Sequence, residues 1–166
     1  MTNLLKVVRV RAGGQLPVLL HFDEYVPLRF RTYTDGIGAG YLRLGNYSTS
    51  LLELIIEPCT QMLRGFTVTS FNRLSTWPQF SVRDVSRGLP VLSTDFDFEG
   101  SGILDLPIEF RVSVREREVL VAWADLEQCD AYRLDRIRFL VQGGYLRGIW
   151  ITELTEVEMN YFCFNT

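Results

Sequence analysis

The chain has 166 residues, of which 47% are hydrophobic, 13% aromatic and 22% charged, and its formal net charge is −3. A chain of this size buries about two-thirds of the surface that it exposes when unfolded, so its core needs neither a metal nor a disulfide. This composition excludes a disordered chain and predicts one globular domain that comprises residues 1–166.

The sequence shows no sign of export or of membrane insertion. Its first residues, Met1–Arg9, lack the basic segment and the apolar run of about 7–15 residues that form a secretory signal. The longest apolar runs, Leu16–Leu20 and Leu51–Ile56, are much shorter than the roughly 20 residues that span a bilayer. We therefore expect a cytoplasmic protein that does not associate with membranes.

The three cysteines, Cys59, Cys129 and Cys163, are widely separated along the chain. Their odd number and their spacing match neither a zinc site nor a small disulfide framework. We therefore predict free thiols in a reducing compartment, and no metal or other cofactor.

Alternating apolar and polar residues make β structure the dominant prediction. In Pro107–Arg115 every second residue is apolar, which is typical of a strand with one face in water. Glu116-Arg117 then leads into the apolar run Glu118–Ala124, so these segments predict a hairpin.

A second hairpin is predicted where Arg136–Gln142 and Tyr145–Leu154 flank the turn dipeptide Gly143-Gly144. The apolar positions of both hairpins predict one shared buried face. Its members are Phe110, Val112, Val114, Val121, Trp123, Phe139 and Val141.

Short strands separated by turn residues are also predicted in the N-terminal half. They are Leu4–Arg11, Val18–Phe22, Leu28–Tyr33, Tyr41–Leu44, Leu51–Glu57 and Met62–Phe71. Leu51–Glu57 fits a helical turn or a buried strand by pattern alone, and its isoleucines favour the strand.

Helices are predicted to be few, because no segment keeps apolar spacings of three and four over about 12 residues. The candidates are Val82–Arg87 and Leu126–Tyr132. The apolar segment Met159–Phe164 fits either a final strand on the core or a contact in a homo-oligomer. The predicted fold class is therefore mainly β, an antiparallel curved sheet or sandwich with one or two short helices.

Two short motifs recur about half a chain apart. Leu63-Arg64-Gly65 returns as Leu146-Arg147-Gly148, and each begins the second strand of a predicted hairpin. Pro27–Arg31 and Pro107–Arg111 are separated by a similar interval. These echoes indicate two related β halves, about 1–83 and 84–166, although coincidence among common residue types also explains them.

One stretch of the chain is acidic: residues 95–109 contain five acids and no basic residue. The stretch begins like a calcium-binding EF-hand loop, but Leu106 stands where that loop needs its bidentate acid. We predict a surface that binds a protein partner, with phenylalanines as apolar anchors beside the charges. The predicted binding residues are Asp95, Phe96, Asp97, Phe98, Glu99 and Asp105.

The sequence contains no recognisable catalytic or nucleotide-binding motif. The single histidine, His21, has no motif that places a serine or cysteine beside it, so we predict a structural role. Gly36–Gly40 lacks the glycine spacing of a phosphate-binding loop. A pI near 5.2 provides no basic footprint for nucleic acid. Carboxylates contributed by distant strands remain an open possibility for catalysis.

A strand-and-turn pattern runs through Tyr41–Gly45, Leu51–Pro58 and Arg64–Ser70. It resembles the small β-rich immunity proteins of bacterial polymorphic toxin and contact-dependent growth inhibition systems. The end of the chain, with Arg138-Phe139-Leu140 and Leu146-Arg147-Gly148-Ile149 leading to Leu154-Thr155-Glu156, is similar to the closing hairpin of the same group. The resemblance covers less than half of the chain and includes no catalytic residue. It implies a cytoplasmic antidote that binds one cognate toxin domain, often a nuclease, and masks its active site.

An acidic surface agrees with this resemblance, because a nuclease active site that attracts phosphate presents basic residues. We therefore expect a stoichiometric inhibitor, not an enzyme, whose partner is a toxin domain with a basic surface. The alternative is an enzyme or a small-ligand carrier with its site inside a β-barrel or between two halves. A roomy, partly apolar cavity with converging polar groups favours this alternative, and an exposed acidic patch favours the inhibitor.

Overall fold

The computed structural model describes residues 4–93, 98 and 100–163, which form two sheets and one helix. The first sheet contains β1 (Val7–Arg11), β2 (Leu19–His21), β3 (Leu28–Arg31), β4 (Gly40–Gly45), β5 (Leu51–Glu57), β6 (Met62–Ser70), β9 (Leu89–Leu92) and β10 (Ile103–Leu106). The second sheet contains β7 (Leu74–Ser75), β8 (Ser81–Arg87), β11 (Arg111–Arg115), β12 (Glu118–Ala122), β13 (Gln128–Leu134), β14 (Ile137–Gln142) and β15 (Tyr145–Ile151). The helix is α1 (Glu156–Cys163). The prediction of a mainly β fold is confirmed.

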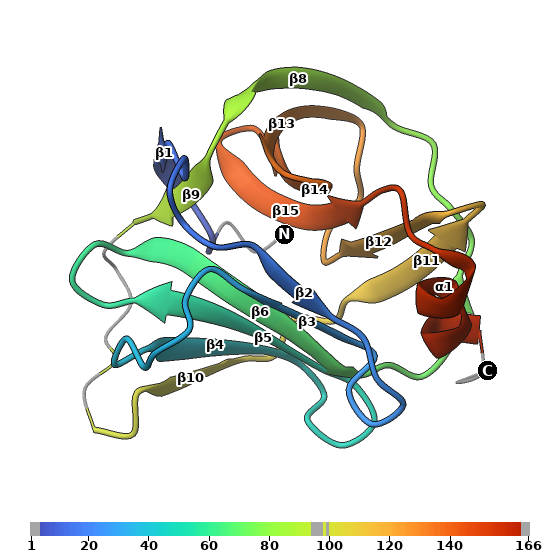
Figure 1. Cartoon of the computed structure of the whole chain (residues 1–166), viewed down its shortest axis with the longest axis horizontal. Helices are drawn as coiled ribbons and strands as arrows, with labels where there is room; N and C mark the ends of the chain where they lie inside the picture. The colour runs from blue at the N-terminus through green and yellow to red at the C-terminus, as the bar shows by residue number, and fades with distance from the viewer. Residues whose placement is uncertain (1–3, 94–97, 99, 164–166) are drawn as a thin grey trace.

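Most neighbouring strands pair antiparallel. The first sheet has the order β1-β9-β6-β5-β4-β10, and β3, with β2 beside it, also pairs with β6. The second sheet has the order β7-β11-β12-β15-β14-β13-β8. Three pairs of the described strands are parallel: β4 with β10, β7 with β11, and β8 with β13. In Figure 1, β2–β6 and β10 occupy the lower half of the view, and the curved second sheet lies above and to the right.

The two hairpins predicted in the C-terminal half are confirmed. β11 pairs with β12 across Glu116-Arg117, and β14 pairs with β15 across Gly143-Gly144. Both glycines have a positive φ, +61° and +83°, which a tight hairpin turn requires. Pro107–Phe110 lies outside β11, although its alternating apolar and polar residues predict that the strand begins at Pro107. This segment carries the chain from β10 in the first sheet to β11 in the second, and proline has no N–H for a ladder.

One hydrophobic core fills the space between the two sheets. Phe30 on β3 lies 5.2 Å from Phe66 on β6 and 6.3 Å from Phe139 on β14, measured between ring centroids. Five members of the predicted face are buried in this core: Val112, Val121, Trp123, Phe139 and Val141. The other two, Phe110 and Val114, are half-buried and pack against it.

Both helices predicted from short amphipathic segments are wrong. Val82–Arg87 belongs to β8, and Leu126–Tyr132 overlaps β13. The two strands pair with each other in parallel, from Ser81 opposite Gln128 to Arg87 opposite Arg133. Short apolar patterns do not distinguish a helix from a strand, and here backbone hydrogen bonds to a remote segment decide the conformation.

Of the two alternatives for Met159–Phe164, the final strand is wrong, because the described part of this segment lies in α1. The helix begins with a capping box. The Glu158 amide donates to Thr155 Oγ1 over 3.2 Å, and the Thr155 amide donates to Glu158 Oε2 over 2.9 Å. These bonds satisfy two donors that a helix N-terminus otherwise leaves free.

Helix α1 is attached to the core through Phe162, which is fully buried. Its ring centroid lies 6.0 Å from that of Phe22 and 6.3 Å from that of Phe71. The described part of the chain contains no helix with the length and hydrophobicity needed to span a lipid bilayer.

The two sheets share one strand order. The path β2-β3-β6-β5-β4-β10 in the first sheet corresponds to β11-β12-β15-β14-β13-β8 in the second, and the last pair is parallel in both. Leu63-Arg64-Gly65 and Leu146-Arg147-Gly148 occupy corresponding places, in β6 and β15. The other echo does not correspond, because Pro27–Arg31 contains β3 whereas Pro107–Arg111 leads into β11, and the counterpart of β3 is β12. A common origin of the halves stays a prediction.

Gly88 joins the two sheets where β8 leaves the second sheet and β9 enters the first. Its φ is +147°, and a Cβ placed there would lie 2.4 Å from the Arg11 carbonyl oxygen. The Gly88 amide also donates to the Arg133 carbonyl over 3.0 Å. The close packing of strands from both sheets at this corner therefore requires glycine.

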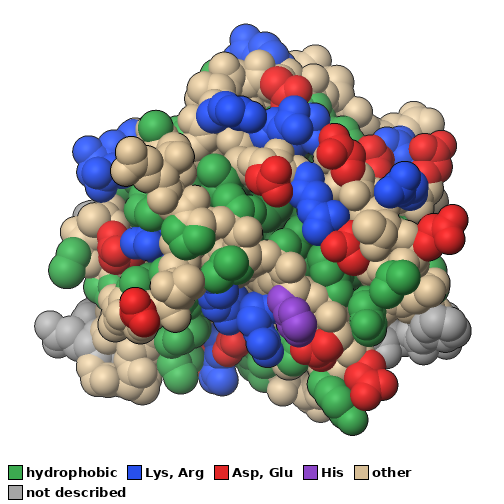
Figure 2. Space-filling model, in the orientation of Figure 1, with side chains coloured by type: hydrophobic (Ala, Val, Ile, Leu, Met, Phe, Trp, Pro, Cys, Tyr) green, Lys and Arg blue, Asp and Glu red, His purple; other side chains and the backbone are tan. Residues whose placement is uncertain are grey.

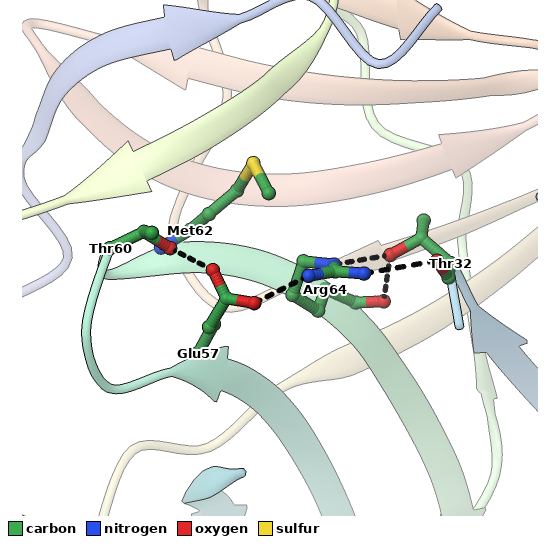
Figure 3. A network of polar contacts seen from close by, with 5 residues as sticks. All are labelled: Thr32, Glu57, Thr60, Met62 and Arg64. Atoms are coloured by element: carbon green, nitrogen blue, oxygen red, sulfur yellow. Dashed lines mark hydrogen bonds and ion pairs between the residues drawn. The ribbon is translucent and has the colours of Figure 1, made fainter. Parts of the chain in front are cut away.

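A buried arginine organises one end of the first sheet (Figure 3). The Arg64 Nη1 atom lies 2.6 Å from Glu57 Oε1, and its Nε donates to Thr32 Oγ1 over 2.9 Å. Thr60 Oγ1 donates to the second oxygen of Glu57 and accepts a bond from the Met62 amide. The side chains of β5 and β6 are thus linked to Thr32, which follows β3.

Candidate functional site

Most of the predicted acidic surface, namely Asp95, Phe96, Asp97 and Glu99, lies outside the described residues. Phe98 is described, and its ring packs against the core beside Gly40. A Cβ at Gly40 would lie only 2.6 Å from this ring. Phe98 therefore covers part of the core, and only the remaining surface of its ring is available to a partner.

Asp105, the other described residue of that surface, lies on β10 and forms an ion pair. Arg43 Nε donates to its Oδ1 over 2.6 Å, and Arg43 Nη2 donates to its Oδ2 over 2.9 Å. These bonds hold the pKa of the Asp105 carboxyl below its usual range. The carboxylate is exposed, but the guanidinium beside it offsets its charge.

A different surface of the molecule combines aromatic rings with arginines, and it lies on the outer face of the second sheet. Residues 76–80 connect β7, at one edge of this sheet, to β8, at the other edge. Six Cα steps from residue 75 to residue 81 span at most about 21 Å. A flat sheet of seven strands is about 29 Å wide, so the sheet must curl around the connection.

Three aromatic side chains meet where this connection crosses the sheet. Trp77 and Phe80 come from residues 76–80, and Trp150 comes from β15 in the middle of the sheet. The ring centroids lie 6.2 Å apart for Trp77 and Trp150, 5.9 Å for Phe80 and Trp150, and 6.4 Å for Trp77 and Phe80. The rings pack on a second small core formed by Leu120, Ala122, Leu126, Cys129, Ala131 and Leu140. All three residues are half-buried.

Two guanidinium groups lie over these indoles. The Arg115 guanidinium is 4.3 Å from the Trp77 ring centroid, and that of Arg138 is 5.0 Å from the Trp150 centroid. Cation–π contacts at these distances favour the stacked arrangement. Arg115 also pairs with Glu118 at 2.8 Å. We call Trp77, Phe80, Trp150, Arg115 and Arg138 the aromatic–arginine surface.

Trp150 separates two hollows of this surface. One hollow, of about 460 Å³, is lined by Trp77, Pro78, Gln79, Phe80, Val82, Arg115 and Trp150. The other, of about 430 Å³, is lined by Glu116, Arg117, Glu118, Arg138, Trp150, Thr152 and Glu153. Five of the seven residues that line the first hollow are aromatic or apolar, whereas five of the seven that line the second are charged.

Sequence reasoning missed this surface. Trp150 lies on the face of the predicted strand Tyr145–Leu154 opposite to Ile149 and Ile151, which are buried in the main core. A large aromatic residue on the face away from that core is a detectable signal. Trp77 and Phe80 carry no such signal, because the path of residues 76–80 across the sheet follows from the pairing of β7 and β8 with remote strands.

The remaining predicted features lie elsewhere. His21 is exposed on β2, with its Nε2 atom 3.4 Å from Asp23. Figure 2 shows this histidine, in purple, among basic and acidic side chains that alternate over the visible face. The described residues contain no group of three His, Cys, Asp or Glu side chains that could hold a metal. No disulfide joins Cys59, Cys129 and Cys163, and Cys129 is buried.

Comparisons of the sequence with protein-family models and with curated proteins return no match. Function is therefore inferred from the surfaces of the molecule itself.

Proposed function

We propose that this protein acts by stoichiometric binding of a protein partner, and that the aromatic–arginine surface makes the central contact. The observation that supports this proposal is the grouping of two tryptophans and a phenylalanine, all only partly buried, beside two stacked arginines. Tryptophan and arginine are the residue types that most often dominate the free energy of binding at protein interfaces.

The surface is also preorganised for binding. Trp150 is fixed on a central strand, and each indole is covered by a guanidinium that is itself held by an acid. Arg138 Nε donates to Asp84 over 3.3 Å, and its Nη1 donates to Thr152 over 3.2 Å. Side chains that are ordered before association lose less conformational entropy when the complex forms.

Within this class we propose an immunity protein that neutralises a cognate toxin domain in the cytoplasm. Support comes from the strand-and-turn resemblance and from the acidic stretch, which would complement a basic toxin surface. Because Arg43 offsets the charge of Asp105, the contribution of this stretch depends mainly on residues 95–99.

The test is titration of the purified chain with the toxin domain encoded by the neighbouring gene, followed by calorimetry. We expect a one-to-one complex, and we expect Trp150→Ala and Arg115→Gln each to weaken it by about tenfold or more. Tyr25→Ala is the matched control, because Tyr25 is 82% exposed and does not belong to the aromatic–arginine surface.

Circular dichroism of each variant separates loss of binding from loss of folding. Unchanged affinity in folded Trp150→Ala and Arg115→Gln would place the interface elsewhere. The absence of any complex at micromolar concentrations, together with no protection of cells that express the toxin, would remove the immunity proposal.

A further inference from the structure

A cleft of about 700 Å³ opens where strands of the two sheets approach each other. It is lined by Val7–Val10 of β1, Ser81–Arg83 of β8, Gln128–Asp130 and Tyr132 of β13, and by Val141, Gly143 and Gly144. β1 is an edge strand of the first sheet, and β8 is an edge strand of the second. The volume lies within the range of about 300–1,000 Å³ that is typical of small-ligand sites.

Backbone hydrogen bonds fix β1 beside this cleft. The Val7 amide donates to the Gly144 carbonyl over 2.9 Å, and the Leu146 amide donates to the Leu5 carbonyl over 2.8 Å. The first bond joins β1 to the turn between β14 and β15, and the second joins the residues just before β1 to the start of β15. Backbone hydrogen bonds therefore hold the two walls of the cleft together, and this does not require any side chain at the rim.

Several polar side chains lie on the side of β8 and β13 that faces the first sheet. Ser81 is paired with Gln128, and Arg83 with Asp130, so each pair shares one face of the sheet. The same face carries Tyr132, two positions along β13, which packs against the main core. Polar groups thus line the margin of the space between the sheets.

Three valines of β1, Val7, Val8 and Val10, line the wall opposite β8 and β13 together with Arg9. Val7 is half-buried and packs against the main core. Val8 is 54% exposed, so its side chain is accessible to a ligand. The rim at Gly143 and Gly144 is open, since a Cβ at either residue would meet nothing within 4 Å. A ligand can therefore reach the valines from solvent.

The charges of the cleft do not balance. Arg83 Nη2 lies 2.8 Å from Asp130 Oδ1, and the Arg83 side chain remains 76% exposed. Arg9 is exposed and forms no ion pair with the described residues. Two guanidinium groups and one carboxylate leave one positive charge beside the valines of β1, in a protein whose net charge is −3.

We propose that this cleft binds a small amphipathic anion. The apolar part of the ligand lies against Val7, Val8 and Val10, and its anionic head pairs with Arg9 and Arg83. Guanidinium groups bind carboxylate and related oxyanions through paired N–H donors, and burial of alkyl groups against valine supplies the remaining free energy. This ligand-binding site is separate from the proposed protein interface on the outer face of the second sheet.

Octanoate is the probe, and its titration into the ¹⁵N-labelled full chain is followed by amide chemical shifts. We expect shifts concentrated at Val8, Val10 and Gly144. Octyltrimethylammonium and 1-octanol carry the same alkyl chain with a positive or a neutral head, and we expect both to bind more weakly than octanoate.

Two sets of variants test the role of charge. Arg9→Gln combined with Arg83→Gln is expected to weaken octanoate binding by about tenfold, whereas Arg29→Gln on β3 is the control that leaves it unchanged. Val8→Glu and Val8→Lys are matched in position and exposure. We expect the glutamate to weaken octanoate binding and the lysine to strengthen it.

Shifts scattered over the surface, or equal affinities for octanoate and 1-octanol, would overturn the proposal. So would unchanged octanoate affinity in the folded Arg9→Gln/Arg83→Gln variant. None of these results depends on a toxin partner, so a failure of this site leaves the test of the aromatic–arginine surface intact.

Discussion

Arg64 and Arg147 occupy the same structural position in the two sheets, although about half of the chain separates them in the sequence. Each is the extra residue of a β-bulge, between Leu63 and Gly65 in β6 and between Leu146 and Gly148 in β15. The Arg64 carbonyl accepts a bond from the Thr32 amide, and the Arg147 carbonyl accepts one from the Trp123 amide, both over 3.0 Å.

The side chains of the two arginines have different surroundings. Arg64 is 9% exposed and bonds to Glu57 and Thr32, whereas Arg147 is 6% exposed and lies 5.1 Å from the Tyr145 ring centroid. The two sheets therefore share the backbone of the bulge, while the partners of the guanidinium differ.

Replacement of Arg64 by alanine tests the importance of its ion pair. The Glu57 side chain is only 21% exposed, so the variant leaves a partly buried carboxylate without its guanidinium. We expect the free energy of unfolding to fall by about 3 kcal/mol in urea denaturation. The double variant Glu57→Ala/Arg64→Ala should lose less than the sum of the two single losses. Strict additivity would show that the pair contributes nothing.

The ion pair between Arg136 and Glu158 makes stability depend on pH. Arg136 Nη1 and Nη2 donate to the Glu158 carboxylate over 2.8 and 2.7 Å, and these bonds hold the pKa of Glu158 below its usual value. A depressed folded-state pKa stabilises the protein above the unfolded pKa of about 4.3. This stabilisation is lost as the pH falls through the folded-state pKa.

Glu158→Gln removes the charge and keeps a capping side chain. We expect the difference in unfolding free energy between the parent and this variant to be about 1–2 kcal/mol at pH 7 and to decrease below pH 4 or so. Glu156→Gln, an exposed change in the same helical turn, is the control. A difference that does not change with pH would contradict the assignment.

The three thiols should differ in reactivity. Burial raises the pKa of the Cys129 thiol to about 11, while Cys59 and Cys163 are exposed. Because the thiolate is the reactive form, we expect a disulfide reagent at pH 8 to modify two thiols in the folded protein and all three in denaturant. The variant Cys129→Ser should lose only the thiol that appears on unfolding. Rapid modification of three thiols in the folded chain would contradict this prediction.

Two phenylalanines of the predicted buried face should differ in their effect on stability. Phe139 is fully buried, so Phe139→Ala should lower the free energy of unfolding by about 3–5 kcal/mol. Phe110 is only half-buried, so Phe110→Ala should cost about half as much or less. Chemical denaturation of both variants checks the order. Equal losses would mean that Phe110 is part of the core in solution.

The sequence contains a helix signal at the start of α1, the capping box, and an apolar run that fits a strand equally well. Thr155 and Glu158 have the spacing of a capping box, which marks the start of a helix. The apolar residues after Met159 are too few to establish helical periodicity, and they fit a strand equally well. The helix is stabilised by the buried Phe162, whose partners Phe22 and Phe71 are distant in sequence.

The predicted acidic site depended on composition alone, which carries no information about pairing. Asp105 and Arg43 are distant in sequence, and only the parallel pairing of β10 with β4 places them in contact. Phe98 is likewise directed to the core by its packing beside Gly40. Neither relationship could be read from the local sequence.

The sequence by itself determined the β class, the two C-terminal hairpins and most of the buried face. Side-chain alternation and the positive φ of Gly143 and Gly144 are local properties, so a short window of sequence contains them. The tertiary structure alone decided the parallel pairing of β8 with β13, the meeting of Trp77 with Trp150, and the cleft beside β1. Each of these joins segments that are remote along the chain, and their approach depends on sheet curvature and strand order, which no local pattern encodes.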